Sequence, residues 1–157
     1  MPEVNRREFI TAATVAAAGI ALFGGCPGLC LAARGRATPG KTDAGPLADF
    51  KADGVFDKFA NTNDFFVIRE NGKLFAVSAL CTHQGEHLRA KQTEFFCPKH
   101  DSTFAFDGEV KPGNKARRSL PRHAISLDDK SHVIVDTTQS FEEKRWDDPA
   151  SFIKLEK

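Results

Sequence analysis

Residues 65–77 read FFVIRENGKLFAV, and this stretch decides the class of fold. Two runs of β-branched and aromatic residues lie on either side of the tetrapeptide ENGK. Asn and Gly both tolerate the positive φ that a two-residue hairpin turn requires, and Asn-Gly between hydrophobic runs is the strongest short-range signal of a β-hairpin. The stretch therefore predicts two antiparallel strands joined at Asn71 and Gly72.

Four more short strands are predicted after this hairpin. They lie at 94–96, 103–106, 123–127 and 132–136, and turn residues follow the second and the third. Only the tail suggests a helix, a short one that begins at Asp148-Pro149. We therefore predict an all-β domain of antiparallel strands.

The size and charge of the chain exclude several classes of protein. Its 157 residues, 41% hydrophobic and 27% charged, are typical of one soluble globular domain. Because 22 Lys and Arg face 21 Asp and Glu, the formal net charge is +1, and no overall field attracts nucleic acid or a membrane surface. The sequence also has no Gly-rich phosphate loop, and no run that interleaves aromatic and basic residues for nucleic acid. Any partner must be recognised by local features.

Two short segments concentrate Cys and His residues. CTH at 81–83 follows the second hairpin strand, and CPKH at 97–100 follows the strand at 94–96. Two thiolates and two imidazoles at strand ends form a donor set for metal, because strands fix the loops in space. Such a set suits a tetrahedral zinc ion or an iron–sulfur cluster. Zinc sites usually take both sulfurs from one Cys-x2-Cys turn, whereas here each loop offers one Cys and one His, which favours a binuclear centre.

This pattern, with the hairpin upstream, resembles the Rieske family of [2Fe-2S] proteins over about residues 50–136. The resemblance implies an antiparallel β-sandwich whose tip, formed by two loops, binds one [2Fe-2S] cluster per chain. It implies that Cys81 and Cys97 bind the inner iron, and that His83 and His100 bind the outer iron near the surface. It further implies one-electron transfer to or from a redox partner, either a larger oxidoreductase subunit or a cytochrome, with no catalytic residues in this chain.

The chain departs from the bc-type members of that family at several positions. Glu86 and Lys99 stand where those members have the two cysteines of a loop disulfide, and their opposite charges suggest either an ion pair or two separately solvated side chains. Gln84 replaces a Leu that packs at the quinol site, and Asp101 replaces a Gly after the second His. These changes weaken an alternative assignment as the iron–sulfur subunit of a quinol–cytochrome c reductase. A structural zinc-binding β module is a second alternative.

Ser102 and Phe104 bear on the reduction potential of such a cluster. In the family a Ser and a Tyr at these positions donate hydrogen bonds to cluster and cysteine sulfur. Ser102 retains the first donor, whereas Phe104 has none, and the chain contains no Tyr. With one donor fewer, and with the negative charge of Asp101 close by, we expect a lowered potential.

The N-terminus resembles an export signal of the twin-arginine type. Arg6 and Arg7 precede the uncharged, Ala-rich stretch 9–33. Because this route carries folded proteins, the resemblance implies that a cofactor is inserted before export to the periplasm. Three fates of the stretch 9–33 stay open: cleavage, cleavage with lipidation at Cys26, or retention as an anchor on the outer face of the cytoplasmic membrane.

The rest of the chain divides by composition. Residues 34–49, RGRATPGKTDAGPLAD, lack a hydrophobic period and predict a flexible linker. The folded domain is then expected at 50–138, with a tail at 139–157. The histidines outside the two motifs are expected to be ordinary surface or strand residues; they are His87, His123 and His132.

A run of cations without an acidic residue follows the second motif. It favours either a solvated basic face or a docking patch for an acidic partner. Its members are Lys111, Lys115, Arg117, Arg118 and Arg122.

Overall fold

The computed structural model describes residues 37–155 of the chain. In this range the regular elements are ten β-strands and three short 3₁₀-helices, so the prediction of an all-β fold is confirmed. No helix of the described range has the length and hydropathy needed to cross a membrane. The predicted export signal, residues 1–33, lies outside the described residues.

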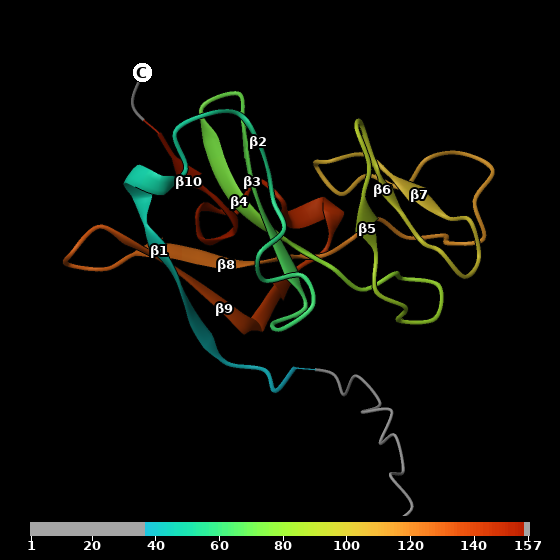
Figure 1. Cartoon of the computed structure of the whole chain (residues 1–157), viewed down its shortest axis with the longest axis horizontal. Helices are drawn as coiled ribbons and strands as arrows, with labels where there is room; N and C mark the ends of the chain where they lie inside the picture. Colours follow the sequence, from blue (N-terminus) through green and yellow to red (C-terminus); the bar gives the residue numbers. More distant parts are fainter. Residues whose placement is uncertain (1–36, 156–157) are drawn as a thin grey trace, which may run out of the picture. The chain divides into compact units, whose positions relative to one another are not determined.

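The strands form two antiparallel sheets (Figure 1). Six strands of the large sheet follow one another in the order β1 (Lys41–Pro46), β9 (His132–Phe141), β8 (Arg122–Leu127), β4 (Lys73–Ser78), β3 (Phe65–Glu70) and β2 (Gly54–Phe56). The seventh, β10 (Ile153–Lys154), also pairs with β4. The small sheet consists of β5 (Arg89–Ala90), β6 (Phe95–Phe96) and β7 (Thr103–Phe104).

The β3–β4 hairpin forms as predicted. Glu70 pairs with Lys73, which leaves Asn71 and Gly72 as the two turn residues. Their φ angles are 52° and 72°, the left-handed values that a type I′ turn needs at both central positions. The Asn-Gly pair therefore sets the register of the hairpin.

This hairpin is buried on both faces and separates two hydrophobic cores. Because side chains alternate along a strand, Phe66 and Ile68 enter the first core, whereas Phe65 and Val67 enter the second. The first core extends to the small sheet, where the ring of Phe66 stacks on that of Phe95 with the centroids 4.4 Å apart. The hairpin thus connects the two sheets by side-chain packing.

The N-terminal boundary of the folded part differs from the predicted one. Residues 41–46, assigned by composition to a linker, form β1 and pair with β9, and the 3₁₀-helix η1 (Leu47–Asp49) follows. The sequence KTDAGP of β1 has no apolar period, so its strand conformation comes from its partner. An ion pair between Asp43 and His132 (Oδ2–Nδ1 2.8 Å) adds a long-range contact. The sequence also predicts none of β2, β5 and β10, because two or three residues are too few for a periodic signal.

The C-terminal tail is likewise part of the fold. It contains the 3₁₀-helices η2 (Glu143–Arg145) and η3 (Pro149–Ser151), and η3 lies where the sequence predicts a helix start. The Arg122 guanidinium lies between the rings of Phe75 and Trp146, 4.0 and 4.3 Å from their centroids. Arg122 is only 7% exposed, so this member of the predicted basic run is buried and helps hold the tail in place.

Candidate metal centre

The two Cys-His segments fold into loops with the same backbone hydrogen bonds. In the first loop, residues 81–86, the Cys81 N–H donates to the Glu86 carbonyl (2.8 Å), and the Gly85 N–H donates to the Cys81 carbonyl (2.7 Å). The second loop, residues 97–102, repeats both bonds around Cys97, at 2.8 and 3.0 Å. The fourth residue after each Cys has a left-handed φ, 70° at Gly85 and 58° at Asp101.

The two loops come from different sheets. The first loop follows β4 of the large sheet, and the second connects β6 to β7 of the small sheet. Packing in the first core brings them together, since Cys81 and Cys97 both belong to that core with exposures of 2% and 0%. The site is therefore complete only when the sheets are packed.

The two thiols lie side by side. The Cys81 thiol is within hydrogen-bonding reach of the Cys97 thiol and of the backbone N–H groups of His83 and Gln84. Burial raises the pKa of the Cys81 thiol, the Cys97 thiol raises it further, and the two N–H groups act in the opposite direction. Both cysteines are free.

The two imidazoles also form a pair. The rings of His83 and His100 meet edge to face, with centroids 4.7 Å apart and an interplanar angle of 86°. The Nδ1 atom of each ring is buried and has no hydrogen-bond partner. Burial lowers the pKa of His100, and His83, Lys115 and Lys99 lower it further, which favours the neutral imidazole that binds metal.

This donor set fits a centre with two pairs of ligands. A buried nitrogen without a partner is costly unless a ligand uses its lone pair, and here two such nitrogens accompany two buried thiols. Among residues 37–155, no three His, Cys, Asp or Glu side chains gather into a site for a single ion. The four predicted donors instead come as one pair of thiols and one pair of imidazoles.

Segment 111–118 covers both loops. The Ala116 N–H donates to Oγ of the fully buried Ser102 (3.2 Å), and the Thr82 hydroxyl donates to the Arg118 carbonyl (2.6 Å). Because the Ser102 oxygen accepts a bond from the backbone, its own hydrogen remains available as a donor.

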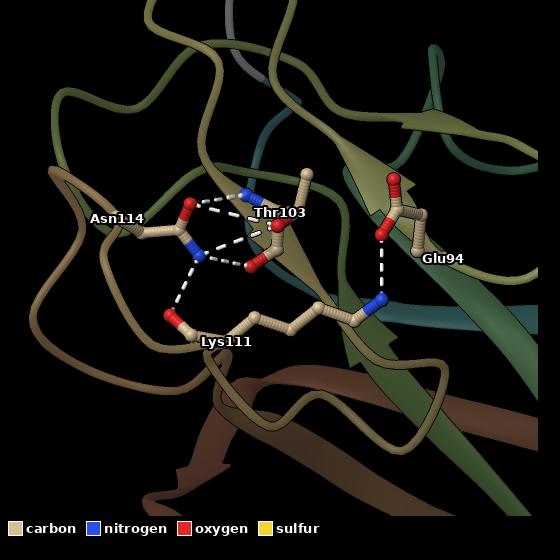
Figure 2. A network of polar contacts seen from close by, with 4 residues as sticks. All are labelled: Glu94, Thr103, Lys111 and Asn114. Atoms are coloured by element: carbon tan, nitrogen blue, oxygen red, sulfur yellow. Dashed lines mark hydrogen bonds and ion pairs between the residues drawn. The ribbon is translucent and has the colours of Figure 1, made fainter.

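Asn114 holds this segment in place, as Figure 2 shows. Its Nδ2 donates to the carbonyls of Thr103 and Lys111, both at 2.7 Å, and its Oδ1 accepts the Thr103 N–H at 3.2 Å. Lys111 in turn forms an ion pair with Glu94 (2.6 Å). The role of Asn114 cannot be predicted from the sequence, because a single Asn after Pro-Gly belongs to no pattern that indicates such contacts.

An ion pair connects the two loops where the sequence suggested one. Lys99 Nζ lies 3.6 Å from Glu86 Oε2, with the side chains 61% and 40% exposed. Such an exposed pair contributes at most about 1 kcal/mol, far less than a covalent link.

The remaining candidates fall into separate environments. Gln84 is exposed at the tip of the first loop, whereas Phe104 is completely buried in the first core. The histidines outside the motifs lie elsewhere. His87 pairs with Asp64 (2.7 Å) and His132 pairs with Asp43, whereas His123 is buried on β8 with an Nδ1 that also has no hydrogen-bond partner.

Comparison with known proteins gives one family and a related structure. The family model described as the Rieske [2Fe-2S] domain matches residues 41–136, from β1 into β9. Among solved structures, the plasma membrane Rieske protein PetC3 of the cyanobacterium Synechocystis PCC 6803 is 30% identical, with a TM-score of 0.46. That similarity covers 60% of this chain and 98% of the other. No curated protein sequence matches significantly.

The positive φ angles of Gly85 and Asp101 predict how substitutions at these positions change the stability of the protein. Gly85→Ala and Asp101→Ala should each lower the free energy of unfolding by about 1 kcal/mol, because Ala is strained at positive φ. Asp101→Gly should not lower it. Denaturant unfolding followed by circular dichroism measures these changes. Gly40→Ala is the control, since a Cβ at Gly40 meets nothing within 4 Å. Equal losses from Gly40→Ala and Gly85→Ala would contradict the prediction.

Proposed function

The chain belongs to the Rieske [2Fe-2S] family, and we propose that Cys81 and Cys97 hold one iron of its cluster while His83 and His100 hold the other. The observation that carries this assignment is that the same two loops supply two buried Nδ1 atoms without a partner and two free, buried thiols. When bound, a [2Fe-2S] cluster takes up and releases one electron at a time.

In this assignment the cysteines bury one side of the cluster, and the histidines bring its other side to the protein surface. The cysteines lie in the first core and exclude water on their side. The two histidines are half-buried at the surface, so a partner approaches through the imidazoles. Segment 111–118 keeps the loops covered through Asn114 and the Ser102 bond.

The biological role that fits best is one-electron transfer as an exported subunit of an envelope oxidoreductase or respiratory complex. A larger oxidoreductase subunit or a cytochrome is its redox partner. The exposed polar side chain of Gln84, at the position of the Leu that packs against quinol in bc-type members, argues against direct quinol oxidation. The ion pair between Glu86 and Lys99, in place of a loop disulfide, separates the chain from those members as well.

Metal analysis tests the ligand assignment. Anaerobically purified protein should contain two irons and two acid-labile sulfides per chain. His83→Ala and His100→Ala should each abolish the cluster, because each removes one of the two protein ligands of an iron. His87→Ala, a half-buried histidine paired with Asp64, is the control and should retain it. One zinc without sulfide in the wild type would overturn the assignment.

The reduction potential tests the roles of Ser102 and Phe104. We expect a midpoint in the lower or middle part of the Rieske range of about −150 to +300 mV, because the chain lacks the phenolic donor and carries Asp101 beside His100. Ser102→Ala should lower the potential, and Phe104→Tyr should raise it. Phe59→Tyr, in the second core, should leave it unchanged. Protein-film voltammetry at neutral pH measures all four proteins, and a Phe104→Tyr value equal to wild type would refute the assigned role of that position.

The export route is tested at the arginine pair. Arg6→Lys with Arg7→Lys should leave the cluster-loaded protein in the cytoplasm, because a receptor shaped for guanidinium groups does not accept ammonium groups as equivalent. Cell fractionation followed by immunoblotting measures the distribution. Arg34→Lys with Arg36→Lys makes the same chemical change outside the signal and should leave export intact. Normal export of the first variant would exclude the twin-arginine route.

A further inference from the structure

Four exposed cations lie on the second loop and on the segment that covers both loops, and we call them the basic rim. Lys99 and Lys115 are close enough to act electrostatically on His100. Arg117 and Arg118 follow on the covering segment, and the Arg118 carbonyl is bonded to Thr82 of the first loop. The members of the basic rim are Lys99, Lys115, Arg117 and Arg118.

The backbone fixes the position of this rim. Ala116 is 3% exposed and belongs to the first core, so the segment is pinned inward at this residue while its neighbours Lys115 and Arg117 are exposed. The hydrogen bond from the Ala116 N–H to Ser102 holds the segment on the second loop, and the Asn114 contacts with Thr103 hold it on β7. The rim therefore stays beside the histidines as part of the folded surface.

The rim is only partly neutralised. Lys99 lies 3.6 Å from Glu86, and Arg118 lies 3.9 Å from Glu142. Within residues 37–155, Lys115 and Arg117 form no ion pair. The net charge of the whole chain is only +1, so the rim is a local positive surface and not part of an overall positive field. One exposed acidic residue, Asp101, follows His100 directly.

We propose that the basic rim is the docking surface for the redox partner, and that it binds a carboxylate-rich surface of that partner. This inference rests on the proposed function. One electron then passes between the cluster and the partner's own redox centre, so that one protein gains the electron the other loses, and no bond or proton is exchanged. Exposed charges of this kind raise the rate of encounter more than the affinity, which suits a carrier that must release its partner. An anionic membrane is a poorer fit, because lipid-binding clusters have 4–8 basic residues and two of these four already face carboxylates.

Oxidants of opposite charge test this surface in the purified, cluster-loaded protein. Stopped-flow mixing of the reduced protein with hexacyanoferrate(III), an anion, should give a rate that falls as salt is added, because about 0.1 M salt screens charges beyond roughly 10 Å. At low salt, Lys115→Glu with Arg117→Glu should slow this reaction about tenfold. The same variant should accelerate oxidation by the cation tris(phenanthroline)cobalt(III).

Lys51→Glu with Lys130→Glu is the matched control. It makes the same change in total charge at two exposed positions, one after η1 and the other in the β8–β9 turn. It should change both rates far less than the rim variant. Equal effects of the two variants, or rates that ignore the charge of the oxidant, would overturn the docking proposal. An intact cluster in these proteins would show that the proposed function still holds.

Binding experiments give a readout that does not depend on the cluster. Isothermal titration calorimetry with poly-L-glutamate at low salt should detect binding to the wild type and to the control variant, and at least tenfold weaker binding to the rim variant. Co-sedimentation with phosphatidylglycerol vesicles tests the membrane as a competing ligand. If the rim variant loses vesicle binding but keeps polyglutamate binding, the rim contacts lipid and the proposal is wrong.

Discussion

Burial of the β3–β4 hairpin on both faces is the constraint on which the rest of the structure depends. The two sheets share no strand, and the small sheet has strands of only two residues, too short to be stable through their own hydrogen bonds. Its position comes from the first core, where Phe66 stacks on Phe95. An unbroken apolar run such as 65–68 is what a strand with two buried faces requires.

The same packing brings the donor groups together. The first loop extends from the large sheet and the second belongs to the small one, so neither sheet alone carries a complete set of ligands. Cys81 and Cys97 are themselves members of the core that joins the sheets. Folding and assembly of the centre are therefore coupled, which agrees with insertion of the cluster before the protein leaves the cytoplasm, as proposed from the N-terminus.

The sequence predicts those features of the fold and the site that depend on residues close together in the chain. The Asn-Gly turn, the apolar strands β3, β4 and β8 and the four candidate donors can all be predicted from the sequence, because each depends on neighbouring residues. Strand β1 was missed since its polar sequence gains strand structure only from β9. The predicted basic run is not one uniform surface, because tertiary contacts bury Arg122 and pair Lys111 with Glu94. Only the structure could show that the Nδ1 atoms of His83 and His100 are buried and have no partner.

The position of Arg122 between two aromatic rings separates it from its basic neighbours in its response to the medium. Its guanidinium donates to the Asp107 carbonyl (Nη2–O 3.0 Å) and is shielded by Phe75 and Trp146, so dissolved ions reach it poorly. Lys115 and Arg117 are exposed, so dissolved ions screen their charges and the strength of their electrostatic interactions changes with ionic strength. Residues 115–122 thus contain one cation that holds the tail at any salt concentration and others whose electrostatic attraction depends on it. A rise in ionic strength weakens the attraction of the exposed cations and leaves the contacts of Arg122 in place.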